Sequence, residues 1–140
     1  MKPKQVVIDT NVFISALRSR RGASFQLLQR LNSGGFEINI SVPLICEFEQ
    51  TAINLNWPGK PARHFIEDIL DYICSLGNKW QIYFLWRPRL SDPKDDMVLE
   101  LAVVSQSEYI ITFNKADFKD ASNFGIKIID PQQFLDKLEV

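Results

Sequence analysis

The chain has 140 residues, of which 46% are hydrophobic and 24% are charged, and its formal net charge at pH 7 is -1. These are ordinary values for a globular protein with one sizeable core, so we expect a single domain over residues 1–140. The near-neutral charge weighs against a protein that coats nucleic acid through bulk basic charge. An enzyme that contacts nucleic acid through one local basic patch remains compatible with it.

Cysteine and histidine are scarce, with Cys46, Cys74 and His64 the only examples. Two isolated cysteines exclude a disulfide framework, and we expect both thiols to fill the core of a protein in a reducing compartment. No apolar run approaches the ~20 residues that cross a bilayer, and no signal segment opens the chain. We therefore expect a cytoplasmic protein without membrane contact.

The hydrophobic pattern alternates between short β-branched runs and stretches of helical periodicity. Predicted strands cover residues 5–9, 37–41, 80–86, 109–112 and 127–129. Predicted helices cover residues 11–19, 23–32 and 63–76, and three more begin near residues 43, 93 and 131. This order predicts a three-layer α/β/α sandwich with a mainly parallel central sheet of about five strands. Ligands of such sheets bind beyond the carboxyl ends of the strands.

Acidic or amide side chains follow four of the five predicted strands. In chain order they are Asp9, Glu47, the group Asp92, Asp95 and Asp96, and then Asn114 with Asp117. Neighbouring strands lie ~4.8 Å apart, so side chains at one sheet edge can meet around one point. Clustered carboxylates repel one another unless a cation neutralises them, and Mg²⁺ prefers oxygen ligands. The pattern predicts metal-assisted hydrolysis of a phosphodiester bond.

Several of these acids also have a purely structural interpretation. Asp9 can cap the amino end of the helix that follows it. Asp92 precedes a proline and suits a helix cap, and Asp95 suits the first helical turn, where the helix dipole favours acids. Asp96 is left without a structural role, at the start of an almost wholly apolar helix.

Two glutamates compete for one position in the helix near residue 43, because periodicity does not separate Glu47 from Glu49. Glu100 lies one turn after Asp96 on the same helix face, and we expect it to be exposed, with a supporting role in the site as the alternative.

Basic and aromatic residues near loops are candidates for contacts with a phosphate-containing substrate. Arg18, Arg20 and Arg21 lie just past the first helix, and each is interpreted either as a solvated surface charge or as a phosphate contact. Trp57 lies in a loop and is free to stack on a base, whereas we expect Trp80 to fill the core.

Four segments together resemble the PIN domain family: VVIDTNVFISAL, SVPLICEFEQ, DPKDDMVLELA and YIITFNKADF. They occur in the family's order, and the resemblance spans residues 6–129. It implies a ribonuclease that depends on Mg²⁺ or Mn²⁺ and cleaves RNA. Small bacterial members are often toxins of toxin–antitoxin pairs, so the resemblance also implies a cognate antitoxin and a homodimer.

Residue by residue, the resemblance makes Asp9, Glu47 and Asp96 the catalytic and metal-binding acids, which selects Glu47 over Glu49. Many members have an acid where this chain has Asn114. Asp117, three residues on, either compensates as a metal ligand or caps a turn.

Asn11 and Thr112 are expected from their positions to orient the acids by hydrogen bonding, with Asn114 in a supporting role as an amide.

Two alternative functions remain open at the level of the sequence. A phosphatase of the haloacid dehalogenase kind would use Asp9 as a covalent nucleophile, but it wants a second Asp where Asn11 stands. A vestigial PIN module would bind RNA or protein without cleavage, which the uncharged Asn114 keeps open.

Overall fold

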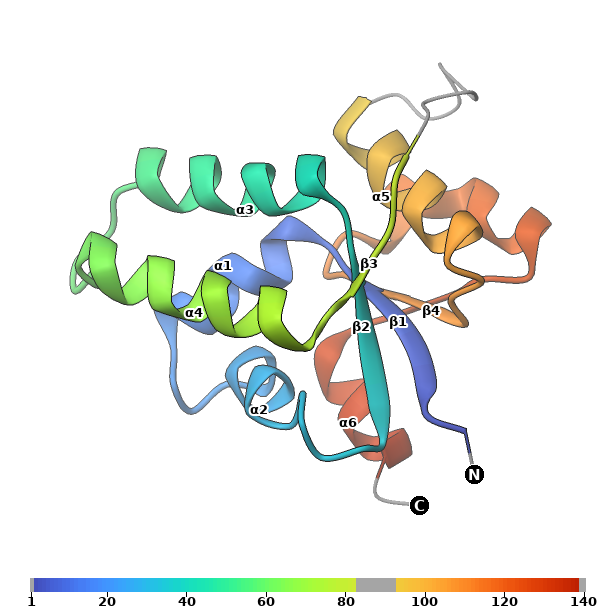
Figure 1. Ribbon diagram of the computed structural model, residues 1–140, viewed down its shortest axis with the longest axis horizontal. Coiled ribbons are helices and arrows are strands. Elements are labelled where there is room, and N and C mark those ends of the chain that lie inside the picture. The colour runs from blue at the N-terminus through green and yellow to red at the C-terminus, as the bar shows by residue number, and fades with distance from the viewer. Residues whose placement is uncertain (1, 83–92, 139–140) are drawn as a thin grey trace.

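The structure is a computed structural model that describes residues 2–82 and 93–138 (Figure 1). The strands are β1 (Lys4–Ile8), β2 (Phe36–Ile40), β3 (Asn78–Lys79), β4 (Tyr109–Ile111) and β5 (Lys127–Ile129). The helices are α1 (Thr10–Arg18), α2 (Ala23–Gln29), α3 (Val42–Asn54), α4 (Arg63–Leu76), α5 (Pro93–Val104) and α6 (Pro131–Leu138). A 3-10 segment, η1 (Lys115–Phe124), lies between β4 and β5. None of the helices in the described ranges is long and apolar enough to cross a bilayer.

The five described strands form one parallel sheet in the order β3-β2-β1-β4-β5. The predicted parallel sheet is therefore confirmed. The prediction for the third strand was wrong in position, because β3 pairs through residues 78–79 and residues 80–82 follow it without strand structure. Residues 83–86 of that prediction, and Asp92, lie outside the described residues. The second helix ends earlier than predicted, at Gln29, and η1 was not predicted.

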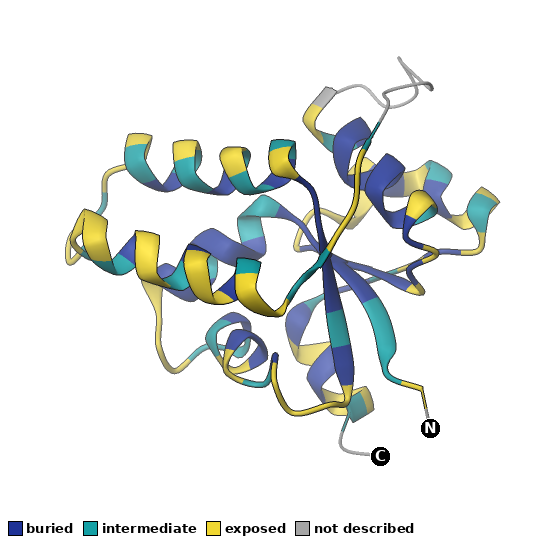
Figure 2. Cartoon of the chain, in the orientation of Figure 1, coloured by how far each residue is buried: buried dark blue, intermediate teal, exposed yellow. Residues whose placement is uncertain are grey.

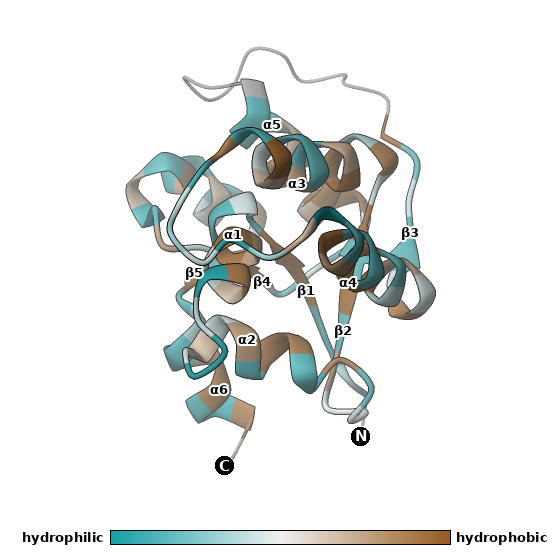
Figure 3. Cartoon of the chain, turned by 90° about the vertical axis from the view of Figure 1, so that its left-hand side faces the viewer, coloured by the Kyte–Doolittle hydropathy of each residue, from teal (hydrophilic) through white to brown (hydrophobic). Residues whose placement is uncertain are grey.

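Helices cover both faces of the sheet and make the three-layer α/β/α arrangement that the sequence predicts. One layer contains α1, α2, α3, α4 and α6, which contact one another in series, and α5 with η1 lies on the opposite face (Figure 1). Each helix turns its buried side inward and its exposed side outward (Figure 2). The same division appears in hydropathy, with apolar strands between helices that carry polar outer faces (Figure 3). Burial of these apolar stripes drives the layers together.

A pair of stacked rings joins α1 to α3 inside the core. Phe13 and Phe48 are both fully buried, with ring centroids 4.8 Å apart and planes 5° from parallel. Phe13 lies four residues after Asp9, and Phe48 directly follows Glu47. The stack therefore sets the distance between the two helices that carry these acids.

A buried amide ties the three strands on one side of the sheet together. Asn39 of β2 donates to Gln5 Oε1 of β1 at 3.0 Å and accepts from Trp80 Nε1 at 2.8 Å. Gln5 and Asn78 both donate to Glu37, and these hydrogen bonds lower the pKa of its carboxyl group. The expectation that Trp80 fills the core was wrong: the residue is 38% exposed, and its indole N–H donates to Asn39 at the edge of the sheet.

The cysteines also differ from expectation, since neither is fully buried. Cys46 is exposed on α3, and Cys74 is half-buried against the core on α4. Burial raises the pKa of the Cys74 thiol, so this thiol is held in its protonated form at neutral pH.

We predict that Phe48→Ala lowers the free energy of unfolding by about 3–5 kcal/mol, because it removes a fully buried ring and leaves a cavity beneath α3. Chemical denaturation followed by circular dichroism measures the change. Val42→Ala on the same helix is the control, since Val42 is 76% exposed and should cost less than about 0.5 kcal/mol. Equal losses from the two variants would contradict the role of the stack.

Candidate active site at the strand switch point

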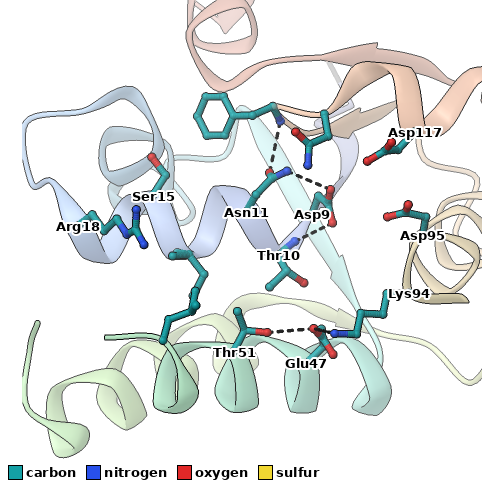
Figure 4. A pocket seen from close by; sticks show the side chains of 14 residues that line it. Asp9, Thr10, Asn11, Ser15, Arg18, Glu47, Thr51, Lys94, Asp95 and Asp117 are labelled. Carbon is teal, nitrogen blue, oxygen red and sulfur yellow. Dashed lines mark hydrogen bonds and ion pairs between the residues drawn. The ribbon is translucent and has the colours of Figure 1, made fainter. Parts of the chain in front are cut away.

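The strand order reverses between β1 and β4, which is where open parallel sheets bind ligands. A cleft of about 510 Å³ opens at this edge, between α1, α3, the start of α5 and the segment after β4. Its lining includes the carboxylates Asp9, Glu47, Asp95 and Asp117 and the cations Lys94 and Arg18. In Figure 4, Asp9, Asp95 and Asp117 lie at one end and Arg18 at the other.

Asp9 occupies the junction of β1 and α1, and its backbone is extended (φ -74°, ψ 156°). Its carboxylate accepts a hydrogen bond from Thr10 N at 2.8 Å, so it caps α1, as the structural interpretation predicted. The same carboxylate also lines the cleft. The cap and the cleft position are therefore compatible, and the helix dipole adds to the stability of the negative charge.

Asn11 and Thr112, the two side chains expected to orient the acids, both contact Asp9. The Thr112 hydroxyl donates to Asp9 Oδ2 at 2.8 Å, and Asn11 Nδ2 approaches the same oxygen at 3.4 Å. Thr112 Oγ1 also accepts from Asn114 N at 3.0 Å and from Asn11 Nδ2 at 3.3 Å. The fully buried hydroxyl thus uses its donor and both acceptor sites, which fixes its rotamer.

The register of β1 against β4 places Thr112 beside Asp9. Ile8 pairs with Ile111, and Asp9 N donates to Ile111 O at 2.9 Å. The next residue on each strand is therefore Asp9 on one side and Thr112 on the other.

Glu47 lies on the cleft side of α3, in one row with Thr51 and Leu55. Its Oε1 accepts from Thr51 Oγ1 at 2.9 Å and forms an ion pair with Lys94 Nζ at 3.1 Å. The Glu47 side chain is 18% exposed and that of Lys94 is 64% exposed. Glu49 does not line this cleft but another depression beside α4. The structure therefore brings Glu47, and not Glu49, to the sheet edge.

The first turn of α5 carries two adjacent acids in different environments. Asp95 is partly exposed and lines the cleft, whereas Asp96 is 2% exposed and lies outside its lining. Glu100 is buried, so the expectation that it is exposed was wrong. The cause is that α5 packs against the sheet and also contacts η1 and α3, which encloses more of its circumference than periodicity alone predicts.

Asn114 and Asp117 both line the cleft and both are exposed. Asn114 precedes η1, and Asp117 lies in its first turn. Asp117 N donates to Asn114 O at 3.1 Å, which closes the turn that brings Asp117 back over the end of β4.

The donor set of the cleft fits a hard divalent cation, because its charged ligands are carboxylates and its neutral ones are amides and hydroxyls. Within residues 2–82 and 93–138, no three acid, histidine or cysteine side chains already converge as a metal cage. Mg²⁺ needs only one or two carboxylates and keeps several waters, so an open group of acids suits it. Glu47, the acid on α3, is held by Lys94 at the side of the cleft (Figure 4).

The fold and the acid-lined cleft define an α/β protein with a candidate site for phosphate chemistry. The sequence model described as PIN domain matches residues 5–116, and the chain belongs to this family. PIN domains are generally nucleases that use divalent metal ions.

Solved structures show the same fold at low sequence identity. One, titled "Structure of FitAB bound to IR36 DNA fragment", has a TM-score of 0.60 and 12% identity, and the match covers 90% of this chain and 94% of that one. Another, of VapBC2 from Rickettsia felis bound to a DNA fragment from its promoter, has a TM-score of 0.59 and 13% identity, covering 90% and 98%. No curated protein sequence matches this chain.

Two features of the cleft were not predicted from the sequence, namely the ion pair of Lys94 with Glu47 and the cleft position of Asp95. Arg18, a candidate phosphate contact in the sequence, lines the cleft. The spacing of Glu47, Thr51 and Leu55 at four-residue steps would have indicated one helix face. No comparable signal in the sequence connects Lys94 to α3.

We predict that Thr112→Val destabilises the fold by about 1–3 kcal/mol, because it leaves the buried Asp9 carboxylate and Asn114 N–H without the hydroxyl. Urea denaturation at neutral pH measures the loss. Thr51→Val is the matched control, because it removes a hydroxyl that donates to the less buried Glu47. It should lower the free energy of unfolding by less than about 1 kcal/mol. A Thr112→Val loss no larger than the control's would contradict the anchoring of Asp9 by Thr112.

Proposed function

We propose that this protein is a metal-dependent endoribonuclease that hydrolyses RNA phosphodiester bonds, and that it is the toxin of a toxin–antitoxin pair. The observation that carries the proposal is the group of carboxylates at the β1–β4 switch point, on a chain that belongs to the PIN domain family. Family membership gives no support to the haloacid dehalogenase alternative.

Asp9, Glu47, Asp96 and Asp117 are the proposed ligands of Mg²⁺ or Mn²⁺, and we add Asp95 because it lines the cleft. A bound ion of this kind neutralises clustered acids and lowers the pKa of a water at a phosphodiester. Asp9 is held in one orientation by Thr10 N–H and Thr112, so it contributes a preorganised oxygen ligand. Asn114 supplies an amide in place of a charge.

Lys94 is the internal counter-ion of Glu47 and competes with a metal ion for the same carboxylate. A divalent cation that binds Glu47 Oε1 has to displace the ammonium. The exposed Lys94 side chain has room to do so at the mouth of the cleft, where a substrate phosphate is an alternative partner.

An antitoxin protein is the proposed partner, and the support is that both structural neighbours, FitAB and VapBC2, are toxin–antitoxin complexes. A homodimer and a cytoplasmic location belong to the same proposal and rest on the resemblance to the toxin members of the family.

We predict that Asp9→Asn abolishes cleavage of single-stranded RNA and the Mn²⁺-dependent rise in melting temperature, because it removes a ligand charge while keeping the size of the side chain. Asp96→Asn should have the same effect. Gel assays of a labelled RNA and thermal melts with 0 and excess Mn²⁺ provide the two measurements, and induced expression should arrest growth only with the wild type.

Asp95→Asn decides between the two neighbouring acids of α5. If Asp96→Asn cleaves normally and Asp95→Asn does not, Asp95 is the third ligand. Full cleavage by both Asp9→Asn and Asp96→Asn would refute the nuclease proposal. A wild type that binds RNA without cutting it under any metal would instead identify the vestigial module.

We predict that Lys94→Gln tightens Mn²⁺ binding by up to about fivefold, because an exposed ion pair is worth ~0.2–1 kcal/mol and no longer has to be broken. Isothermal titration calorimetry measures the dissociation constant. Lys115→Gln is the control for a general loss of positive charge, since Lys115 binds Gln133 away from the cleft. Equal effects of the two variants would rule out competition at Glu47.

A further inference from the structure

Arg18 ends the helix that Asp9 begins, and both residues line the same cleft. The nine residues of α1 rise by 1.5 Å each, so the two ends are separated by about 13 Å. One side of α1 forms the floor between them, through Asn11, Ile14 and Ser15. The cleft is therefore a short groove, acidic where Asp9 lies and basic where Arg18 lies (Figure 4).

The guanidinium of Arg18 is held in place by an aromatic face. It lies over the Trp57 ring with its Cζ 5.1 Å from the centroid. Trp57 packs against the core, and Lys60 Nζ lies 5.5 Å from the same ring. Lys60 Nζ in turn donates to Ile53 O at 2.8 Å and Leu55 O at 2.7 Å, which fixes the loop at the end of α3.

A cation–π contact uses the charge of the guanidinium and not its N–H groups as hydrogen-bond donors, and no acceptor in the part of the chain that the structure describes binds the guanidinium of Arg18, so its N–H groups remain available to an anion. Across residues 2–82 and 93–138 no carboxylate forms an ion pair with Arg18. Arg63, by contrast, lies 3.9 Å from Glu67 on its own helix. An exposed, prepositioned guanidinium with no acidic partner at the end of a groove is suited to bidentate binding of a phosphate.

We infer that Arg18, positioned by Trp57, binds a backbone phosphate of single-stranded RNA at a distance from the bond that is cut. The inference rests on the proposed nuclease function and adds a substrate subsite to it. Stacked nucleotides advance by ~3.4 Å, and extended ones by more, so about 13 Å corresponds to roughly two to four nucleotides from Asp9. A dinucleotide at the acidic end therefore does not reach Arg18.

If the contact of Arg18 with Trp57 serves only to stabilise the fold, a different result is expected. Arg18 lies in the last turn of α1, where a cation is stabilised by the helix dipole, and its stacking on Trp57 ties α1 to the loop after α3. If this were its whole role, replacing it would lower the melting temperature and leave RNA affinity unchanged.

The test compares binding of an octanucleotide and a dinucleotide RNA by fluorescence anisotropy, in an Asp9→Asn background that leaves the RNA intact. Arg18→Ala should weaken octanucleotide binding about tenfold, since it removes a charge-assisted contact. It should also reduce the slope of log affinity against log salt by about 0.7. Dinucleotide binding should not change. Arg18→Lys keeps the charge but not the bidentate geometry of the guanidinium, so its octanucleotide affinity should lie between those of Arg18→Ala and the Arg18 protein.

Arg20→Ala is the matched control, because Arg20 also stacks on a ring, Phe65 at 5.2 Å, but does not line the cleft. It should leave both affinities unchanged. Equal losses from Arg18→Ala and Arg20→Ala, or a loss that is the same for the dinucleotide, would overturn the subsite.

Melting temperatures of the same variants separate folding from binding. If Arg18→Ala is destabilised, the comparison passes to Arg18→Lys, which should keep the salt slope of the Arg18 protein but bind the octanucleotide more weakly, because lysine lacks the bidentate geometry. An octanucleotide affinity unchanged in Arg18→Lys would then overturn the inference. If the wild type cleaves RNA but Arg18→Ala binds the octanucleotide with unchanged affinity, the subsite is refuted and the nuclease proposal stands. A wild type that neither binds nor cleaves RNA refutes the nuclease proposal and the subsite together.

Discussion

The pairing of β1 with β4 is the constraint on which the site depends. It places Ile8 opposite Ile111, and the hydrogen bond from Asp9 N to Ile111 O at 2.9 Å extends that register by one residue. Asp9 and Thr112 consequently leave the sheet side by side, and the hydroxyl of one binds the carboxylate of the other. A slip of β1 by one residue would turn its side chains to the opposite face of the sheet and separate Asp9 from Thr112.

The cleft combines like charges that a folded protein must neutralise. Hydrogen bonds from Thr10 N–H and Thr112 stabilise Asp9, and Lys94 stabilises Glu47. The protein thus maintains the acid group with its own donors, and the chemistry of those oxygen ligands suits a divalent cation. Arg18 stands apart from this neutralisation, because its guanidinium is held by Trp57 rather than by an acid. The two cations of the cleft therefore have separate roles.

Much of the fold was predictable because burial imposes periodicity on the sequence. The helix over residues 63–76 and the start of α6 at Pro131 were predicted at their observed positions, since each has a clear apolar stripe or a terminal proline. β3 was misplaced because a two-residue edge strand has too few side chains to alternate. Glu100 and Trp80 were misassigned because their surroundings are formed by η1, α3 and Asn39, which are distant in the chain.

The sequence by itself determined the order of strands and helices, the acids that follow the strands, and the family to which those segments belong. These properties follow from local spacing, since the apolar face of a helix and the end of a strand are both set by residues that are close together in the sequence. Only the tertiary structure decided that Asp95 rather than Asp96 lines the cleft, that Lys94 pairs with Glu47, and that Trp57 holds Arg18. The physical reason is that the rotation of one helix against another is set by packing in the shared core, and periodicity does not specify it.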